Sequence, residues 1–389
     1  MRDNSNKKGC IEGINYVGGT RVVVCFENGI ITSVRDAGLK QNDDIWLAPG
    51  LIDNQVNGYV NVNFSNPGIT TDQFDKLVIE MSGDGITAFV PTVITDSDNN
   101  LKSAFRNLAK LVNESQYGEM VPGFHLEGPY LSKSEGYYGC HPYQYLRDPS
   151  WDEFSSYQEA ALGRIMEITI APETKGAIHF IERCISEGIK VSIGHTAADA
   201  QQIWAAIDAG AVMSTHLGNG CANMIDRHKN PIWPQLADDR LCASIIADGH
   251  HLLPEELKVF TRSKGTSNII LISDATHLIG LPPGDYSLMG QVVRKTEAGL
   301  VTVPGLNCLA GASFPLLSGV NNMVKLTGLS YEEALNMASS NVARVLGLNN
   351  RGVLEAGRRA DLIQFKIDGQ GISIQATWVG GKKVFSKSV

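Results

Sequence analysis

Five apolar runs in this sequence end at side chains that can bind a metal ion or carry a proton. Their ends are, in order, Glu127, His195, His216, Asp248 with the adjacent His250 and His251, and Asp274. Such runs are typical of buried strands, and a carboxylate at a buried strand end is costly unless a positive charge meets it. If the carboxyl ends of parallel strands converge, these side chains surround one point, which predicts a metal site.

Glu127, His195 and His216 are the predicted metal ligands. Three nitrogen and oxygen ligands leave a coordination position open for water, as in catalytic zinc sites. A divalent ion lowers the pKa of bound water toward about 7 and polarises a carbonyl. Asp274 is then more useful as a general base that passes the proton to a leaving amine. The simpler alternatives are a Glu127 paired with Lys or Arg, rim histidines bonded to neighbours, and an Asp274 that is a ligand or salt-bridge partner.

Loops after these strands carry further polar residues. His141 follows the Glu127 strand and is placed to hydrogen-bond a substrate carbonyl, or it is an ordinary loop histidine. Asn219 and Gly220 follow the His216 strand on a loop whose free N–H groups suit an anion.

Three other features have weaker functional interpretations. Because His250 and His251 are adjacent, we expect at most one of them to point to the site. The basic run 227–229 is typical of a solvated face. Gln55 and Asn57 end the first strand, and because amides are poor metal ligands, we expect no second metal there.

Strand-like and helix-like runs alternate between about residues 49 and 346, which favours a parallel sheet with helical crossovers. Candidate strands begin near Leu51, Thr87, Gly123, Glu167, Lys190, Met213, Cys242 and Asn268. Eight strands predict a (β/α)8 TIM barrel, whose C-terminal face carries the site. Helices are expected at 72–82, 176–186, 197–209 ending before a Gly210 cap, 314–326, and 330–346, which opens with the capping box Ser330-x-x-Glu333.

The two ends of the chain predict a second, smaller domain. Runs at 21–26 and 30–34 flank the turn Glu27-Asn28-Gly29, which is typical of a β-hairpin. Strand-like runs recur at 361–365, 372–374 and 377–385. We therefore expect an α/β protein in which residues 1–48 and 350–389 form a small β-sandwich and residues 49–349 form the barrel. A loop-rich insertion opens at 282–284, and the loop 309–313 is expected to lie over a substrate.

The composition fits a globular enzyme. Of the 389 residues, 43% are hydrophobic, enough for a large core. A net charge of -8 without clustered Lys and Arg argues against nucleic-acid binding. No signal peptide follows the polar first residues, and no apolar stretch approaches the roughly 20 residues that span a bilayer. Seven irregularly spaced cysteines predict reduced thiols in a cytoplasmic protein rather than a disulfide framework.

Seven segments together resemble a known family. They are 47–53, 125–129, 194–196, 215–217, 246–251, 273–276 and 356–362. In combination they resemble the motifs of the N-acetylglucosamine-6-phosphate deacetylases of the amidohydrolase superfamily, over nearly the whole chain. The resemblance implies a TIM barrel with a β-sandwich, a homodimer, and hydrolysis of the acetamide of N-acetylglucosamine 6-phosphate to acetate and the free amine.

The resemblance also implies roles for individual residues. Glu127, His195 and His216 resemble the ligands of one divalent metal per subunit, zinc or else iron, manganese or cobalt. Asp274 resembles the catalytic acid/base, His141 the residue at the acetyl carbonyl, and His251 one at the sugar. The other substrate-lining positions are Cys140, Asp248, His250, Leu309, Ala310 and Gly311, and the phosphate positions are Asn219, Gly220 and Arg227.

The sequence departs from the family pattern in the predicted phosphate region. After His216 the family usually reads Leu, an aromatic residue, Asn, Ala and Met, whereas this chain has Leu217-Gly218-Asn219-Gly220-Cys221. The segment 227–234 also differs. An unphosphorylated or different N-acyl sugar is therefore an alternative substrate, and a catalytically silent, metabolite-binding barrel is the alternative of another class.

Overall fold

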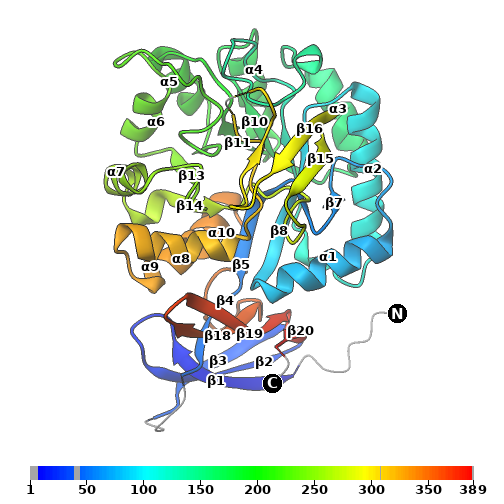
Figure 1. The fold of residues 1–389 in the computed structure, drawn as a ribbon. Coiled ribbons are helices and arrows are strands. Elements are labelled where there is room, and N and C mark those ends of the chain that lie inside the picture. Colours follow the sequence, from blue (N-terminus) through cyan, green and yellow to red (C-terminus); the bar gives the residue numbers. More distant parts are fainter. Residues whose placement is uncertain (1–7, 39–43, 307, 388–389) are drawn as a thin grey trace.

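The computed structural model describes residues 8–38, 44–306 and 308–387. A helix-wrapped barrel lies above a smaller sheet (Figure 1). The barrel strands are β5 (Leu51–Val56), β8 (Ile86–Ile94), β9 (Phe124–Glu127), β10 (Ile165–Ile170), β11 (Lys190–Ile193), β12 (Met213–Ser214), β13 (Cys242–Ile246) and β14 (Ile269–Ile272). They pair in sequence order from β5 to β14, which confirms the predicted eight-stranded parallel barrel.

The first and last strands close the barrel. The Asp274 N–H donates to the Gln55 carbonyl at 3.0 Å, and Val56 forms a parallel bridge with Ala275. Residues next to the predicted site are therefore also the residues that join β14 to β5.

Helices cover the outside of the barrel (Figure 1). They are α1 (Thr71–Gly83), α2 (Asp98–Glu114), α3 (Trp151–Ala160), α4 (Ala177–Ser186), α5 (Ala200–Asp208), α6 (Ile232–Ala237), α7 (Pro254–Lys264), α8 (Leu316–Thr327), α9 (Tyr331–Met337) and α10 (Ser340–Leu346). The predicted helices 72–82 and 176–186 are confirmed, and α5 begins later than expected because Asp199 is its N-cap. On α1, Phe74, Leu77, Val78 and Met81 are buried, which is the spacing of one helix face.

The prediction of one helix over 330–346 is wrong. The Ser330 capping box is present, but the chain leaves the helix at Ala338–Ser339, where Ser339 has φ -144° and ψ -86°. The Ala338 carbonyl accepts a hydrogen bond from the Ile52 N–H of β5 at 2.8 Å. The break thus ties α9 and α10 to the barrel.

The terminal segments form a separate sheet of seven strands, as predicted from both chain ends. These are β1 (Gly9–Asn15), β2 (Arg21–Glu27), β3 (Ile30–Asp36), β4 (Trp46–Pro49), β18 (Leu362–Asp368), β19 (Gly371–Val379) and β20 (Lys382–Ser386). They are hydrogen-bonded in the order β20-β19-β18-β4-β1-β2-β3. The predicted hairpin is confirmed, and its turn residues Asn28 and Gly29 have φ of 52° and 79°, as a tight hairpin turn requires. The run 377–385 is two strands separated by the turn Gly380–Gly381.

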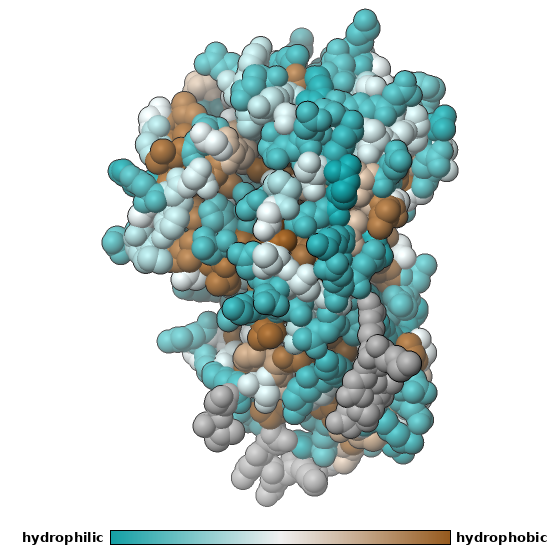
Figure 2. Space-filling model, turned by 90° about the vertical axis from the view of Figure 1, so that its right-hand side faces the viewer, coloured by the Kyte–Doolittle hydropathy of each residue, from teal (hydrophilic) through white to brown (hydrophobic). Residues whose placement is uncertain are grey.

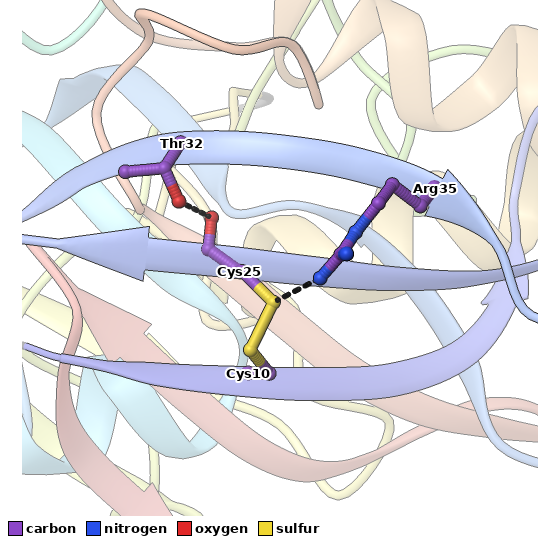
Figure 3. Close-up of a disulfide and its surroundings, with 4 residues drawn as sticks. All are labelled: Cys10, Cys25, Thr32 and Arg35. Atoms are coloured by element: carbon purple, nitrogen blue, oxygen red, sulfur yellow. Dashed lines mark hydrogen bonds between the residues drawn. A yellow bond between two sulfur atoms is a disulfide. The ribbon is translucent and has the colours of Figure 1, made fainter.

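The prediction that the cysteines are reduced thiols is wrong for two of them. Cys10 on β1 lies directly opposite Cys25 on β2, and their sulfurs form a disulfide (Figure 3). Arg35 of β3 donates to the Cys25 sulfur at 3.4 Å. The pairing follows from the strand register, which cysteine spacing does not reveal. Cys140, Cys184, Cys221, Cys242 and Cys308 are free.

The insertion after β14 is more ordered than the predicted loop. It forms a three-stranded antiparallel sheet of β15 (Gly284–Leu288), β16 (Gln291–Lys295) and β17 (Val301–Thr302). Leu278, Leu288, Val293, Val301 and Ala310 are buried together beneath it. This insertion sheet lies in front of the barrel (Figure 1), and bridges from Leu309 to Thr302 and from Ala312 to Ala275 attach the loop 309–313.

One face of the molecule is mainly polar. The face shown in Figure 2 is covered mainly by hydrophilic side chains, with the apolar ones in separate groups. Within the described ranges, no helix combines the length and the apolar character that a bilayer crossing requires.

A buried ion-pair network joins the terminal sheet to the barrel. Asp361 accepts from Arg351 at 2.8 Å and from Arg359 at 2.9 Å, and its Oδ1 also accepts the Gly380 N–H at 2.7 Å. Arg351 also donates to the carbonyl of Glu119 at 2.6 Å. One carboxylate therefore holds two arginines and a turn.

Replacing Asp361 by Ala leaves the buried guanidinium of Arg351 without its counter-ion, while Arg359 keeps Glu119 at 2.9 Å. We expect a loss of about 3–5 kcal/mol in the free energy of unfolding, measured as a lower urea midpoint by circular dichroism. Asp285→Ala is the control, because it removes a solvent-exposed carboxylate paired with Arg294. Equal urea midpoints for the two variants would contradict this role.

Candidate active site

The predicted site residues lie at the carboxyl ends of the barrel strands. Glu127 is the last residue of β9, while His195, His216 and Asp274 each stand two positions beyond β11, β12 and β14. These last three have φ of 49°, 32° and 46°. Such left-handed backbone is uncommon for non-glycine residues and concentrates at functional sites. All four side chains line one cavity of about 860 Å³.

The three predicted ligands converge closely. The Glu127 Oε1 lies 3.1 Å from the His216 Nε2 and 3.5 Å from the His195 Nε2, and the two Nε2 atoms are 3.1 Å apart. Ligand atoms about 2.0–2.2 Å from a tetrahedral ion stand roughly 3.3 Å from one another. The three atoms therefore fit one divalent ion.

Hydrogen bonds and charge prepare this arrangement. The His195 Nδ1 bonds to the Tyr137 carbonyl at 3.0 Å, which leaves its Nε2 facing the other two ligand atoms. Burial alone would raise the pKa of Glu127, but hydrogen bonds from His195 and His216 hold this pKa well below its usual value. The carboxylate is thus ionised, as a metal ligand must be.

His141 belongs to the same cluster. It forms a second possible ligand set with Glu127 and His195, in which the candidate atoms lie within 4.8 Å of one another, a looser set than the predicted one. Its Nδ1 bonds to the Thr95 hydroxyl at 2.8 Å, and its ring packs edge-on against His195 at 4.4 Å. Burial, then the neighbouring His195, lowers the pKa of His141 to about 3, so its ring is neutral.

Two amides donate hydrogen bonds to the carboxylates of the site, and one of them contacts both. The Gln55 Nε2 donates to Glu127 at 3.1 Å and to Asp274 at 3.3 Å, and the Asn57 Nδ2 donates to Asp274 at 2.8 Å. Burial, then the charge of Glu127, raises the pKa of Asp274 to about 6. The sequence drew attention to Gln55 and Asn57 only as residues that cannot bind a second metal. Because Gln55 and Asn57 lie at the end of a barrel strand, the sequence could have indicated that their amides reach the site carboxylates.

Eight of the predicted substrate residues line the cavity. They are Cys140, His141, Asn219, Gly220, His251, Leu309, Ala310 and Gly311. The Asn219 Nδ2 is buried and has no hydrogen-bond partner among the described residues, so it is available to a ligand.

Three predicted residues lie outside this lining. Asp248 stands behind His251 and accepts from its Nδ1 at 2.8 Å, which orients the ring. His250 points elsewhere and packs against Phe314 at 5.3 Å. Arg227 lies on an exposed stretch, where its carbonyl accepts from the Trp233 indole. Among the described lining residues there is no Lys or Arg.

Other lining residues were not anticipated. Glu135, Tyr138, Cys221 and Glu256 also face the cavity. They come from loops or a helix start and follow no apolar strand, so no pattern in the sequence marks them.

Comparisons with known proteins place this site in context. The model of the amidohydrolase family matches residues 46–384. The chain is 32% identical to the N-acetylglucosamine-6-phosphate deacetylase of Vibrio furnissii over 94% of this chain and 90% of the relative. It is 30% identical to the N-acetylgalactosamine-6-phosphate deacetylase of Escherichia coli O157:H7, over 91% and 92% of the two chains.

Solved structures show the same similarity. A mutant of the Mycobacterium smegmatis N-acetyl-D-glucosamine-6-phosphate deacetylase, in complex with N-acetyl-D-glucosamine-6-phosphate, superposes with a TM-score of 0.85 at 29% identity, covering 94% of this chain and 95% of that one. The N-acetylglucosamine-6-phosphate deacetylase from Pasteurella multocida gives a TM-score of 0.86 at 25% identity, covering 97% and 99%.

Removing one imidazole from the converging set tests metal binding directly. We expect His216→Ala to bind divalent metal more than about 100-fold more weakly than the unmodified protein, measured by metal analysis after dialysis against a graded metal buffer. His250→Ala is the control and should keep full metal content, because the His250 ring packs against Phe314 and not against the three ligand side chains. Full occupancy in His216→Ala would exclude His216 as a ligand.

Proposed function

Because the chain belongs to the N-acetylglucosamine-6-phosphate deacetylase family of the amidohydrolases, we propose that it hydrolyses the N-acetyl group of N-acetylglucosamine 6-phosphate. The products are acetate and the free amine of glucosamine 6-phosphate. The observation that carries this proposal is the convergence of Glu127, His195 and His216 beside Asp274 in one cavity.

Glu127, His195 and His216 would hold one divalent ion, zinc or else iron, manganese or cobalt. When bound, such an ion supplies the Lewis acidity that activates water and polarises an acyl carbonyl. Asp274 accepts a proton from the attacking water and returns it to the sugar nitrogen as the carbon–nitrogen bond breaks. Gln55 and Asn57 hold this carboxylate in place, and His141 is placed to contact the acetyl oxygen.

The rest of the cavity would hold the sugar phosphate. His251, oriented by Asp248, is placed to contact a sugar hydroxyl. The free amide of Asn219 and the backbone of Gly220 are available to the phosphate. We propose that residues 1–48 and 350–389 form one domain and residues 49–349 the catalytic domain.

We also propose that the protein is a homodimer. Met224 is 90% exposed and Trp233 is 50% exposed, and both lie on the segment that follows His216. Large apolar side chains gathered on one exposed segment are typical of interaction surfaces. A monomeric mass in solution, measured by light scattering at micromolar concentration, would rule this arrangement out.

A second substrate is favoured by one observation. The described residues that line the cavity include no Lys or Arg, but they do include the carboxylates of Glu135 and Glu256. A neutral N-acetylated sugar fits this charge distribution. Acetate release from N-acetylglucosamine with and without the 6-phosphate decides between them: a higher kcat/KM for the phosphorylated sugar supports the proposal, and release from neither compound rejects deacetylation.

Replacing Asp274 by Asn keeps the shape of the side chain but removes the proton acceptor. We expect kcat to fall by about 10²–10⁴-fold, while metal content stays near that of the unmodified enzyme. The measurement is acetate release together with metal analysis of the same sample. Normal turnover in this variant would show that another group moves the proton.

Asn57 contributes to the pKa of Asp274 and so to the pH range in which this carboxylate accepts a proton. Its hydrogen bond lowers the pKa of Asp274, against burial and Glu127, which raise this pKa to about 6. Asn57→Ala should therefore raise the pKa and move the acidic limb of the kcat/KM profile to higher pH. Asn63→Ala, in the nearby strand β7 (Val62–Asn63), is the control. If the acidic limb of the kcat/KM profile moves to lower pH or does not move, Asn57 does not lower the pKa of Asp274.

A further inference from the structure

A second cavity of about 770 Å³ adjoins the proposed active site. The two cavities share a wall formed by the loop 138–141 together with Ile94, Met289 and Leu306. His141, which we place at the acetyl oxygen, is part of this wall. His141 therefore lines both cavities, and the second one is here called the side cavity.

The lining of the side cavity has the chemistry of a neutral carbohydrate site. Tyr138, Tyr143 and Tyr145 supply aromatic rings, and Tyr143 is 54% exposed although it packs edge-on against Tyr138 at 5.5 Å. Amide side chains supply most of the other polar groups: Asn63, Asn66, Asn100, Gln144 and Gln291. Amides and tyrosines pair with hydroxyl groups, and an aromatic face covers the apolar face of a sugar ring.

The lining of the side cavity carries little charge. Asp96 is the one carboxylate among the described lining residues, and neither Lys nor Arg occurs there. Its two oxygens already accept from the Ser97 N–H and the Asn100 amide. The side cavity thus offers neutral donors and acceptors but no counter-charge for a phosphate.

The walls of the side cavity are held in place without a ligand. Gln291 of β16 donates to the Cys140 carbonyl at 3.1 Å, which fastens the loop 138–141 to the insertion sheet. Arg147 donates to the Tyr145 carbonyl at 2.6 Å and also reaches the carbonyl of Asp96. The loop is anchored on both sides, so a ligand would meet a formed site.

We propose that the side cavity binds a second, neutral sugar unit joined by a glycosidic bond to the N-acetylated sugar phosphate, so that the enzyme deacetylates phosphorylated disaccharides. This proposal rests on the proposed deacetylase function and extends its substrate class. The chemistry at the acetamide is unchanged: water adds to the acyl carbon, the carbon–nitrogen bond breaks, and the nitrogen takes a proton. The glycosidic bond stays intact.

The test compares N-acetylglucosamine 6-phosphate with three disaccharides in which glucose is attached to its O1, O3 or O4. We expect at least one disaccharide to be deacetylated with a kcat/KM equal to or above that of the monosaccharide. Tyr143→Ala should lower kcat/KM for that disaccharide by about tenfold, the loss of one stacked ring, and leave the monosaccharide unchanged. Tyr143→Phe keeps the ring and should keep the activity, and Trp204→Ala is the control for an exposed aromatic residue elsewhere.

The outcomes separate this proposal from the proposed function. Hydrolysis of the monosaccharide without any disaccharide overturns the side-cavity proposal and leaves the deacetylase function standing. Hydrolysis of none of the four compounds overturns both. Equal losses on both substrates in Tyr143→Ala also overturn the proposal. A saturable effect of free glucose on monosaccharide turnover would show that the cavity takes an unlinked sugar, and this too overturns it.

Discussion

The buried negative charge of Glu127 constrains the whole mouth of the barrel. A carboxylate at the end of β9 loses its water and costs several kcal/mol unless positive or hydrogen-donating groups replace that water. His195 and His216 approach it within 3.5 Å from the ends of β11 and β12, and Gln55 donates to it from β5. The same charge raises the proton affinity of Asp274. One anion therefore sets both the positions of the imidazoles and the protonation of the proposed base.

Barrel closure and site geometry depend on the same short segments. Asp274 follows β14, its backbone N–H bonds to the Gln55 carbonyl, and the side chain of Gln55 returns to the Asp274 carboxylate. His195, His216 and Asp274 all have left-handed backbone. Such conformations persist where the surrounding structure over-determines them. The parallel ladders below and the loops above supply that restraint, so the rigid part of the fold fixes the reactive side chains.

The barrel and the converging side chains could be predicted because both follow from a local pattern. An apolar run that ends at Glu127, His195, His216 or Asp274 identifies a buried strand and a polar tip at once, and the strand count then brings the tips together. The Cys10–Cys25 disulfide could not be found this way, since it depends on register between strands. The break at Ala338–Ser339 was missed because the carbonyl that leaves the helix finds its partner on distant β5. The insertion sheet was expected as a loop, and the side cavity takes its lining from segments far apart in the sequence, which no local pattern reveals.

Charge balance explains why the amides of Gln55 and Asn57 suit a site for one metal ion. Glu127 and Asp274 are the carboxylates closest to the converging ligand atoms, and one divalent ion cancels their two charges. Glu167, at the β10 strand of the barrel, is mostly protonated at neutral pH because burial raises its pKa to about 8. A second divalent ion would add two positive charges that only neutral amides could meet, and the cost of burying them would be unopposed. The amide N–H groups of Gln55 and Asn57 instead donate to the two carboxylates. They orient these carboxylates and do not compete with them for the ion.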